Sequence, residues 1–308
     1  MRSTPIRIAR LALLALAAAA PLHAQRAEPA PDSALTARLE ALTRGFHGQV
    51  GIYVRNLRTG VNARLNADSV FPTASMIKVP ILLTLFDQVE QGKLDLDARV
   101  AYPDTLHYRY VESTDVVGYM MAGDTLPVSE LAFLMLTVSD NVASLWIQAL
   151  VGGGATVNEW LAGHGFQQTR VNSRTPGREE ARSAYGWGQT TPREIAEALV
   201  MIREGRAASP RASEAMYRLL TNSYWKGVGL SQIPPTVQAA SKQGFVDRSR
   251  SEVLLVNAPS GDYVLSVITK DQADTGYEPG NEGYRLIRAV SRAVYEHFNA
   301  GDPWRPQP

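Results

Sequence analysis

Alternation of apolar and polar residues marks both ends of the chain. It runs over residues 49–55 and, much later in the sequence, over 253–257 and 263–269. A period of two is typical of β-strands that bury one face. A turn at 56–60 leads to a further short strand at 61–65, and the turn residues of 258–262 predict a hairpin between the two late strands.

Helical spacing of apolar residues dominates the sequence between these strands. Helices are predicted over 33–42, 75–91, 126–138, 142–151, 210–220 and 282–298. Another begins at Thr191-Pro192-Arg193-Glu194, where a threonine cap, a proline and a capping-box glutamate coincide. The glycines at 152–154 are expected to end a helix, and the polar stretch 167–189 is expected to be a long structured loop.

The order of these elements favours an α+β fold. Strands come first, many helices follow, and strands and a helix come last, which argues against a parallel βαβ sheet. We predict an antiparallel sheet flanked by helices, with an inserted all-helical region. A chain of 308 residues fits one domain over 35–300, with its sheet part at about 35–70 and 222–300 and its helical part at about 71–221.

The N-terminus has the pattern of a signal peptide over residues 1–24. Arg2, Arg7 and Arg10 precede a short apolar run at 11–20, and small residues end at Ala24. We therefore expect a periplasmic or secreted protein, with residues 25–34 disordered at the start of the mature chain. An uncleaved amphipathic start is the alternative. The apolar run is too short to span a bilayer, and no membrane span is expected after cleavage.

Composition excludes several kinds of chemistry. The 31 basic and 30 acidic residues nearly balance, so nucleic acid is not an expected partner. The chain has no cysteine, which excludes disulfides and thiolate catalysis. Its five histidines lie far apart and in no metal-ligand spacing, so neither a metal nor a cofactor is expected. No serine lies in a Gly-x-Ser-x-Gly turn.

The first candidate for chemistry is Ser75-Met76-Ile77-Lys78. Positions i and i+3 of a helix share a face, so the lysine amine can reach the serine hydroxyl and remove its proton. Four apolar residues follow directly, which predicts a buried helix start. A second Ser-x-x-Lys, at 223–226, follows a predicted helix and leads into glycines, so we expect it to be a chance match.

Two further short motifs follow in the chain. Ser139-Asp140-Asn141 interrupts a helical pattern; it supplies either a hydroxyl and a carboxamide for a cleft or, more simply, a helix cap. Ser241-Lys242-Gln243-Gly244 comes just before a strand-rich stretch. It offers a positive charge for a substrate carboxylate, and its glycine lets the backbone approach a ligand closely.

Taken together and in this order, the three motifs resemble those of class A β-lactamases and penicillin-binding proteins. The resemblance extends to Phe71-Pro72-Thr73-Ala74, to Gln91-Gly92-Lys93-Leu94 and to Thr190-Thr191-Pro192. It covers about residues 35–298, nearly the whole mature chain. It implies a penicillin-recognising serine hydrolase fold and no metal.

The resemblance also implies roles for individual residues. Ser75 would be the nucleophile and Lys78 its base. Ser139 would pass a proton to the leaving nitrogen, and Asn141 would hold the substrate's side-chain amide. The N–H groups of Ser75 and Phe245 would form an oxyanion hole, and Gly244 would allow close backbone approach. Lys242 would bind the substrate carboxylate. Arg250 or Arg248 would help it, since Ser251 occupies the family's arginine position.

The chain departs from the family in the loop that serves deacylation. The family's Glu-Pro-x-x-Asn loop corresponds to Thr175-Pro176-Gly177-Arg178-Glu179, so the glutamate position holds Thr175. A second family asparagine corresponds to Leu145, and the third motif has Gln243 where the family has Thr or Ser. Either Glu179 serves as the base from the other side of the cleft, or the acyl-enzyme is hydrolysed slowly; Glu179 and Glu180 are otherwise solvated loop charges.

The sequence thus predicts a class A-like serine β-lactamase that inactivates β-lactam antibiotics. Two alternatives remain open. One is a D,D-carboxypeptidase or penicillin-binding type amidase or esterase acting on cell-wall peptide. The other is a non-catalytic β-lactam sensor, which would need a route to the cytoplasm. The expected partner is a small-molecule substrate, and the expected state is a monomer.

Overall fold

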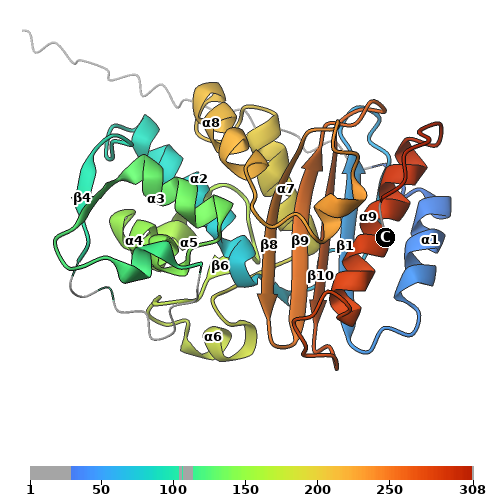
Figure 1. Cartoon of the computed structure of the whole chain (residues 1–308), viewed down its shortest axis with the longest axis horizontal. Coiled ribbons are helices and arrows are strands. Elements are labelled where there is room, and N and C mark those ends of the chain that lie inside the picture. The colour runs from blue at the N-terminus through green and yellow to red at the C-terminus, as the bar shows by residue number, and fades with distance from the viewer. Residues whose placement is uncertain (1–28, 104–105, 107–113, 307–308) are drawn as a thin grey trace, which may run out of the picture.

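An antiparallel five-stranded sheet is the centre of the molecule (Figure 1). The computed structural model describes residues 29–103, 106 and 114–306. The strands lie in the order β2-β1-β10-β9-β8. β1 pairs with β10 from Gln49 opposite Lys270 to Asn56 opposite Tyr263, so the early and late strands are neighbours. The predicted α+β fold is confirmed. The strands are β1 (Gln49–Asn56), β2 (Asn62–Leu65), β8 (Ala239–Val246), β9 (Ser249–Val256) and β10 (Tyr263–Lys270).

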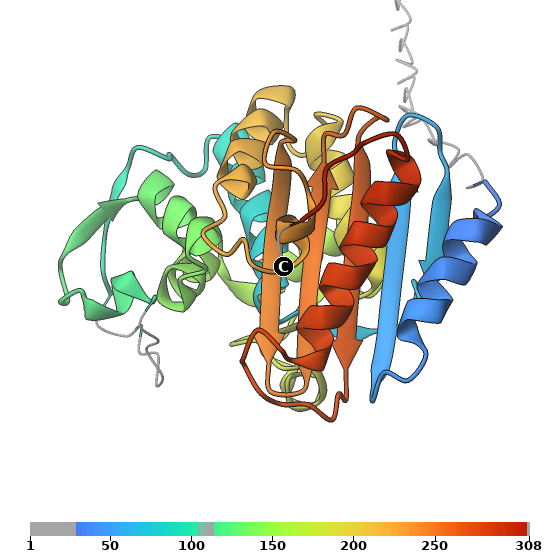
Figure 2. The ribbon, with the colours of Figure 1, turned by 45° about the vertical axis from the view of Figure 1, so that its right-hand side comes forward.

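Helices cover both faces of this sheet. α1 (Ser33–Thr43) and α9 (Glu282–Phe298) pack side by side on one face (Figure 2), and α7 (Pro192–Arg203) packs on the other. Because side chains alternate along a strand, β1 supplies both cores. Ile52 is buried under α1 and α9, whereas Tyr53 is buried on the opposite face, in the core that continues into the helical region.

The helical region packs beside the β8 edge of the sheet (Figure 1). Its central helix α2 is apolar on nearly all sides and is buried over most of its length. The region contains the 3-10 helix η1 (Ala74–Ile77), α2 (Lys78–Glu90), α3 (Val128–Thr137), α4 (Asn141–Leu150), α5 (Gly153–Gly163) and α8 (Pro210–Thr221). Short strands complete it: β3 (Phe71–Pro72), β4 (Arg99–Ala101), β5 (Thr125–Pro127), β6 (Arg170–Val171) and β7 (Gly188–Thr190).

Several expected boundaries differ from the structure. The glycines at 152–154 were expected only to end a helix, but α5 also begins among them. Gly152 and Gly153 have φ of 97° and 89° at this junction. The predicted loop 167–189 contains the short helix α6 (Glu179–Tyr185) besides β6 and the start of β7. The third motif lies inside β8 rather than before the strands.

The N-terminal segment also differs in part. α1 begins at Ser33, inside the segment predicted to be disordered, because Asp32 caps it by accepting a hydrogen bond from Leu35 N at 2.7 Å. Asp32 N in turn donates to Asn62 O on β2. The predicted signal peptide at 1–24 lies outside the described residues.

Candidate active site

Ser75 and Lys78 lie where the 3-10 helix η1 passes directly into α2. Ala74, just before Ser75, has φ of 43°, which turns the chain sharply out of β3. Lys78 is completely buried, and Nζ of Lys78 lies 3.1 Å from Oγ of Ser75. The spacing of three residues therefore places the amine against the hydroxyl, as the sequence predicted.

The second motif, Ser139-Asp140-Asn141, lies against Lys78 of the first. Ser139 has φ of 67° and stands between α3 and α4. Asp140 is the cap of α4, accepting from Ala143 N at 2.8 Å, and it also accepts from Val117 N at 2.9 Å. Since Asp140 performs the capping, Ser139 and Asn141 are left to point toward Lys78.

Four oxygens surround the Lys78 amine. Besides Ser75 Oγ, these are the Ser139 carbonyl at 2.5 Å, Ser139 Oγ at 3.0 Å and Asn141 Oδ1 at 2.8 Å. A lysine nitrogen carries at most three hydrogens, so it cannot donate to all four oxygens at once. The contact to Ser75 is the longest of the four. Lys78 is thereby held in place by the second motif while its nitrogen stays within reach of the Ser75 proton.

The third motif brings a second buried lysine to the same hydroxyl. Lys242 on β8 is 2% exposed, and its Nζ donates to Ser139 Oγ at 2.9 Å and to the Gln243 carbonyl at 3.0 Å. Burial, together with the positive charge of Lys78, holds the pKa of Lys242 well below the usual range of lysine. The Ser139 hydroxyl thus links the two amines.

Gly244 allows β8 to lie directly against η1. A Cβ at this position would come within 2.6 Å of the Thr73 carbonyl and 2.9 Å of Ser75 N. No other residue type fits there without a shift of the backbone. The next residue, Phe245, lines the same cleft as Ser75.

Asp115 supports the second motif and was missed by the sequence analysis. It is fully buried and directly precedes the 3-10 helix η2 (Val116–Tyr119) in the sequence. Its carboxylate accepts from Asn141 N at 2.6 Å and from Asn141 Nδ2 at 3.3 Å. The second bond turns the amide so that Oδ1 faces Lys78. Asp115 lies 26 residues before Asn141, so no local pattern connects the two.

Aromatic side chains form the walls of the cleft at Ser75. Trp187, Trp225 and Phe245 line it together with Val246. Trp225 is fixed because its Nε1 donates to the Val138 carbonyl at 3.1 Å. The second Ser-x-x-Lys surrounds this tryptophan: Ser223 Oγ donates to the Trp225 carbonyl, and Lys226 is exposed. This segment therefore belongs to the cleft wall. No sequence pattern pointed to either tryptophan as part of the site.

Comparison with known proteins agrees with the resemblance carried by these motifs. The family model described as "Beta-lactamase enzyme family" matches residues 34–298. The chain belongs to this family. It is a serine hydrolase of the β-lactamase type, and the resemblance inferred from the three motifs is confirmed.

Solved structures of the same fold cover most of the chain. PBP-A is 27% identical with a TM-score of 0.78, covering 88% of this chain and 98% of its own. A PBP-A variant determined as an acyl-enzyme complex with penicillin G is also 27% identical, with the same coverage and a TM-score of 0.77. A β-lactamase from Sphaerobacter thermophilus is 24% identical over 87% of this chain and 98% of its own, with a TM-score of 0.75.

The structure does not bring Glu179 to the cluster of β-lactamase motif residues. Glu179 is exposed at the start of α6, where its carboxylate accepts from Gly177 N at 3.1 Å. Thr175, at the family's glutamate position, is buried and donates to the Ser173 carbonyl at 3.0 Å. None of the described residues that line the cleft carries a carboxylate. The position of Glu179 is that of a solvated loop charge.

Arg250 and Arg248 are near the cleft but are not among the residues that line it. Arg250 is completely buried, stacked against Tyr277 and Tyr284, and its guanidinium donates to four backbone carbonyls. The exposed Arg248 donates to the carbonyls of Asp271 and Gln272. These contacts tie the β8–β9 turn to the segment before α9, and the role of Arg250 in carboxylate binding stays a prediction.

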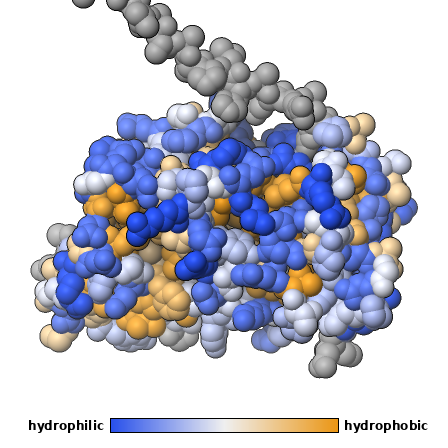
Figure 3. Space-filling model, turned by 90° about the horizontal axis from the view of Figure 1, so that it is seen from above, coloured by the Kyte–Doolittle hydropathy of each residue, from blue (hydrophilic) through white to orange (hydrophobic). Residues whose placement is uncertain are grey.

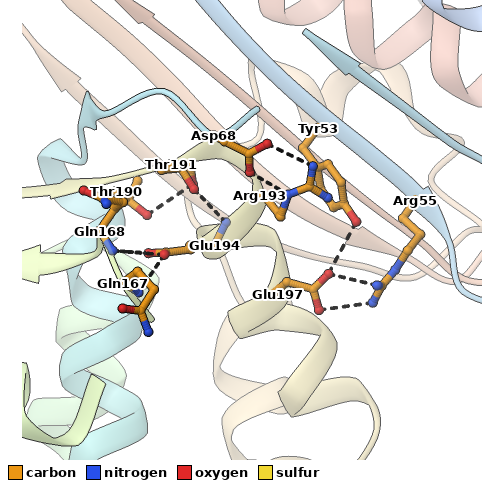
Figure 4. Close-up of polar contacts among 10 residues, drawn as sticks. All are labelled: Tyr53, Arg55, Asp68, Gln167, Gln168, Thr190, Thr191, Arg193, Glu194 and Glu197. Carbon is orange, nitrogen blue, oxygen red and sulfur yellow. Dashed lines mark hydrogen bonds and ion pairs between the residues drawn. The ribbon is translucent and has the colours of Figure 1, made fainter. Parts of the chain in front are cut away.

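The start of the segment 167–189 is held against α7 by Glu194 (Figure 4). Its carboxylate accepts from the backbone N–H groups of Gln167, Gln168 and Thr169 at 2.7, 3.0 and 2.6 Å. Thr191 caps α7 by accepting from Glu194 N at 3.1 Å. One carboxylate therefore fixes the start of the loop to the helix that follows it.

Two structural features are absent from the described residues. Residues 29–103, 106 and 114–306 contain no group of three His, Cys, Asp or Glu side chains placed to hold a metal ion. Over the same residues, no helix combines the length and apolar character needed to cross a bilayer.

Proposed function

We propose that this protein opens β-lactam rings and related amides by forming an acyl-enzyme on Ser75. One observation carries the proposal. The Lys78 amine lies between the hydroxyls of Ser75 and Ser139, and Lys242 contacts Ser139 from the other side. This chain of contacts supplies a base for the nucleophile and a route for the proton to the leaving group.

Acylation then proceeds in two proton steps. The neutral amine of Lys78 takes the Ser75 proton while Oγ bonds to the carbonyl carbon. As the C–N bond of the tetrahedral intermediate breaks, Ser139 gives its proton to the leaving nitrogen and regains one from Lys78. The amine returns to its starting state. The N–H groups of Ser75 and Phe245, placed by the close approach at Gly244, stabilise the oxyanion.

Substrate binding follows from the remaining cleft residues. Asn141 Nδ2 holds the side-chain amide of the substrate, and the Lys242 ammonium attracts its carboxylate. Gln243 does not replace the family's hydroxyl, because its carboxamide donates to the Trp225 carbonyl at 2.8 Å. With both nearby arginines bonded elsewhere, carboxylate binding rests on Lys242 alone, and affinity for penicillins is low.

Deacylation is the slow step. Hydrolysis of the Ser75 ester needs a base that activates water, and the described cleft lining offers no carboxylate for this. This favours a penicillin-binding type amidase or esterase over a fast β-lactamase. The natural substrate is a cell-wall peptide or a small acyl compound. We further propose that residues 1–24 direct export to the periplasm or the medium, where such substrates occur.

Burst kinetics with a chromogenic cephalosporin test this proposal. We expect rapid release of about one equivalent of chromophore per enzyme, followed by a much slower steady rate. A fast linear rate without a burst would instead support the class A β-lactamase. The absence of both phases in the native enzyme, with a burst in a matched family enzyme, would contradict acylation itself.

A further inference from the structure

A second cavity opens on the helical region, apart from the cleft at Ser75. It has a volume of about 470 Å³, and none of its lining residues lines the catalytic cleft. Ligand pockets in proteins have volumes of roughly 300–1,000 Å³. Three helices that pack on one another contribute to it: α2 supplies Phe86, α3 supplies Ala132, and α8 supplies Ala215 and Leu219.

The chemistry of this cavity changes from its floor to its rim. The four side chains above are apolar, and Phe86 and Ala132 are buried in the core. The exposed side chains of α8 at the rim are Arg211, Glu214 and Arg218. Arg218 pairs with Glu214 at 3.0 Å, which leaves the positive charge of Arg211 in excess. Figure 3, which looks onto the end of the molecule that carries α8, shows apolar surface exposed between strongly polar residues.

We propose that this cavity binds a small apolar molecule with one anionic head group, such as an alkyl carboxylate. The alkyl part lies on Phe86 and Leu219, and the head group meets the guanidinium groups at the rim. A cationic head group of the same chain length would meet repulsion from the same arginines. Charge therefore selects among otherwise similar amphiphiles.

The position of the cavity couples this site to catalysis. α2 begins at Lys78, α3 ends just before Ser139, and α8 ends just before the cleft wall at Trp225. The contacts between Lys78 and Ser139 are at hydrogen-bond length, so a movement of α2 away from α3 would lengthen them. We therefore expect a ligand that spreads these helices to slow acylation of Ser75.

Titration calorimetry of the purified protein with decanoate tests binding. We expect one site, and affinity about fivefold to tenfold weaker in the double variant Arg211→Gln/Arg218→Gln, which changes only exposed side chains. Ala215→Trp fills the cavity and abolishes binding. Trp187→Ala, in the catalytic cleft, leaves binding unchanged. No binding of decanoate, equal binding of decyltrimethylammonium, or loss of binding only in Trp187→Ala would overturn the proposal.

The effect of cavity binding on acylation is measured in a separate experiment. Saturating decanoate should lower the rate of chromophore release from a chromogenic cephalosporin about fivefold or more. The double arginine variant should need a correspondingly higher concentration. An unchanged rate at saturation would overturn the coupling. Because binding is measured without any β-lactam, failure of the Ser75 proposal is distinguishable from failure of this one.

Discussion

Lys242 donates a hydrogen bond of 2.9 Å to Oγ of Ser139, the same atom that accepts from Lys78. Two buried amines therefore meet at one hydroxyl, and each raises the cost of charging the other. Both amines are shielded from solvent, since Lys78 is fully buried and Lys242 is 2% exposed. The pH dependence of the enzyme follows from this arrangement.

We predict that kcat/KM for a carboxylate-bearing β-lactam falls at alkaline pH, below the ordinary pKa of lysine. Burial and Lys78 lower the pKa of Lys242, so its ammonium loses its proton as pH rises through that lowered value. The neutral amine no longer attracts the substrate carboxylate. The measurement is a pH–rate profile. Lys242→Arg stays charged and should lose this alkaline limb; an unchanged limb in that variant would assign it to another group.

Asp115→Ala should weaken both stability and acylation. The variant leaves the Asn141 N–H groups without their buried acceptor, which costs about 1–3 kcal/mol of unfolding free energy. Without the second bond the Asn141 amide is free to turn away from Lys78, so acylation slows about tenfold to a hundredfold. Denaturant unfolding and burst kinetics measure the two effects. Asp124→Ala, in an exposed turn, is the matched control, and equal effects in both variants would contradict the assignment.

Glu194→Ala should loosen the start of the segment 167–189. The backbone N–H groups of residues 167–169 lose a common acceptor, at a cost of about 1–3 kcal/mol. Hydrogen exchange at these three residues should rise. Glu204→Ala removes only an exposed pair with Arg206 and should change stability by less than about 1 kcal/mol. Unaltered exchange in Glu194→Ala would show that the loop is held by other contacts.

Glu179→Gln should leave the rate of deacylation unchanged. The side chain is exposed and contacts Gly177 N at the start of α6, away from the described cleft lining. Single-turnover hydrolysis of a preformed acyl-enzyme is the direct measurement. Accumulation of acyl-enzyme in the variant, beyond that of the native protein, would restore Glu179 as the base.

The residues of the first two motifs, which the structure brings together, share one property. Ser75 and Lys78 are three positions apart in continuous helical structure, and Ser139 and Asn141 flank a single cap, so local spacing fixes their geometry. The antiparallel sheet was likewise predictable, because strands and helices were segregated along the chain. Lys242 was found through the order of the motifs rather than through its own surroundings.

What the sequence missed depends on contacts between distant segments. Asp115 reaches Asn141 across 26 residues, and Trp225 reaches the Val138 carbonyl across 87. Arg250 is near Lys242 in sequence, but the β8–β9 register places it opposite Phe245 and therefore on the other face of the sheet from Lys242. The carbonyls before α9 hold its guanidinium. No periodicity or composition reports such pairings.

The most direct test is to locate the covalent bond. The protein is mixed with a chromogenic cephalosporin, and intact-protein and peptide mass spectrometry find the modified residue. We expect one adduct per chain on Ser75. It should be absent in Ser75→Ala and retained in Ser223→Ala, the matched change in the second Ser-x-x-Lys. An adduct on any other residue, or one that survives Ser75→Ala, would contradict it.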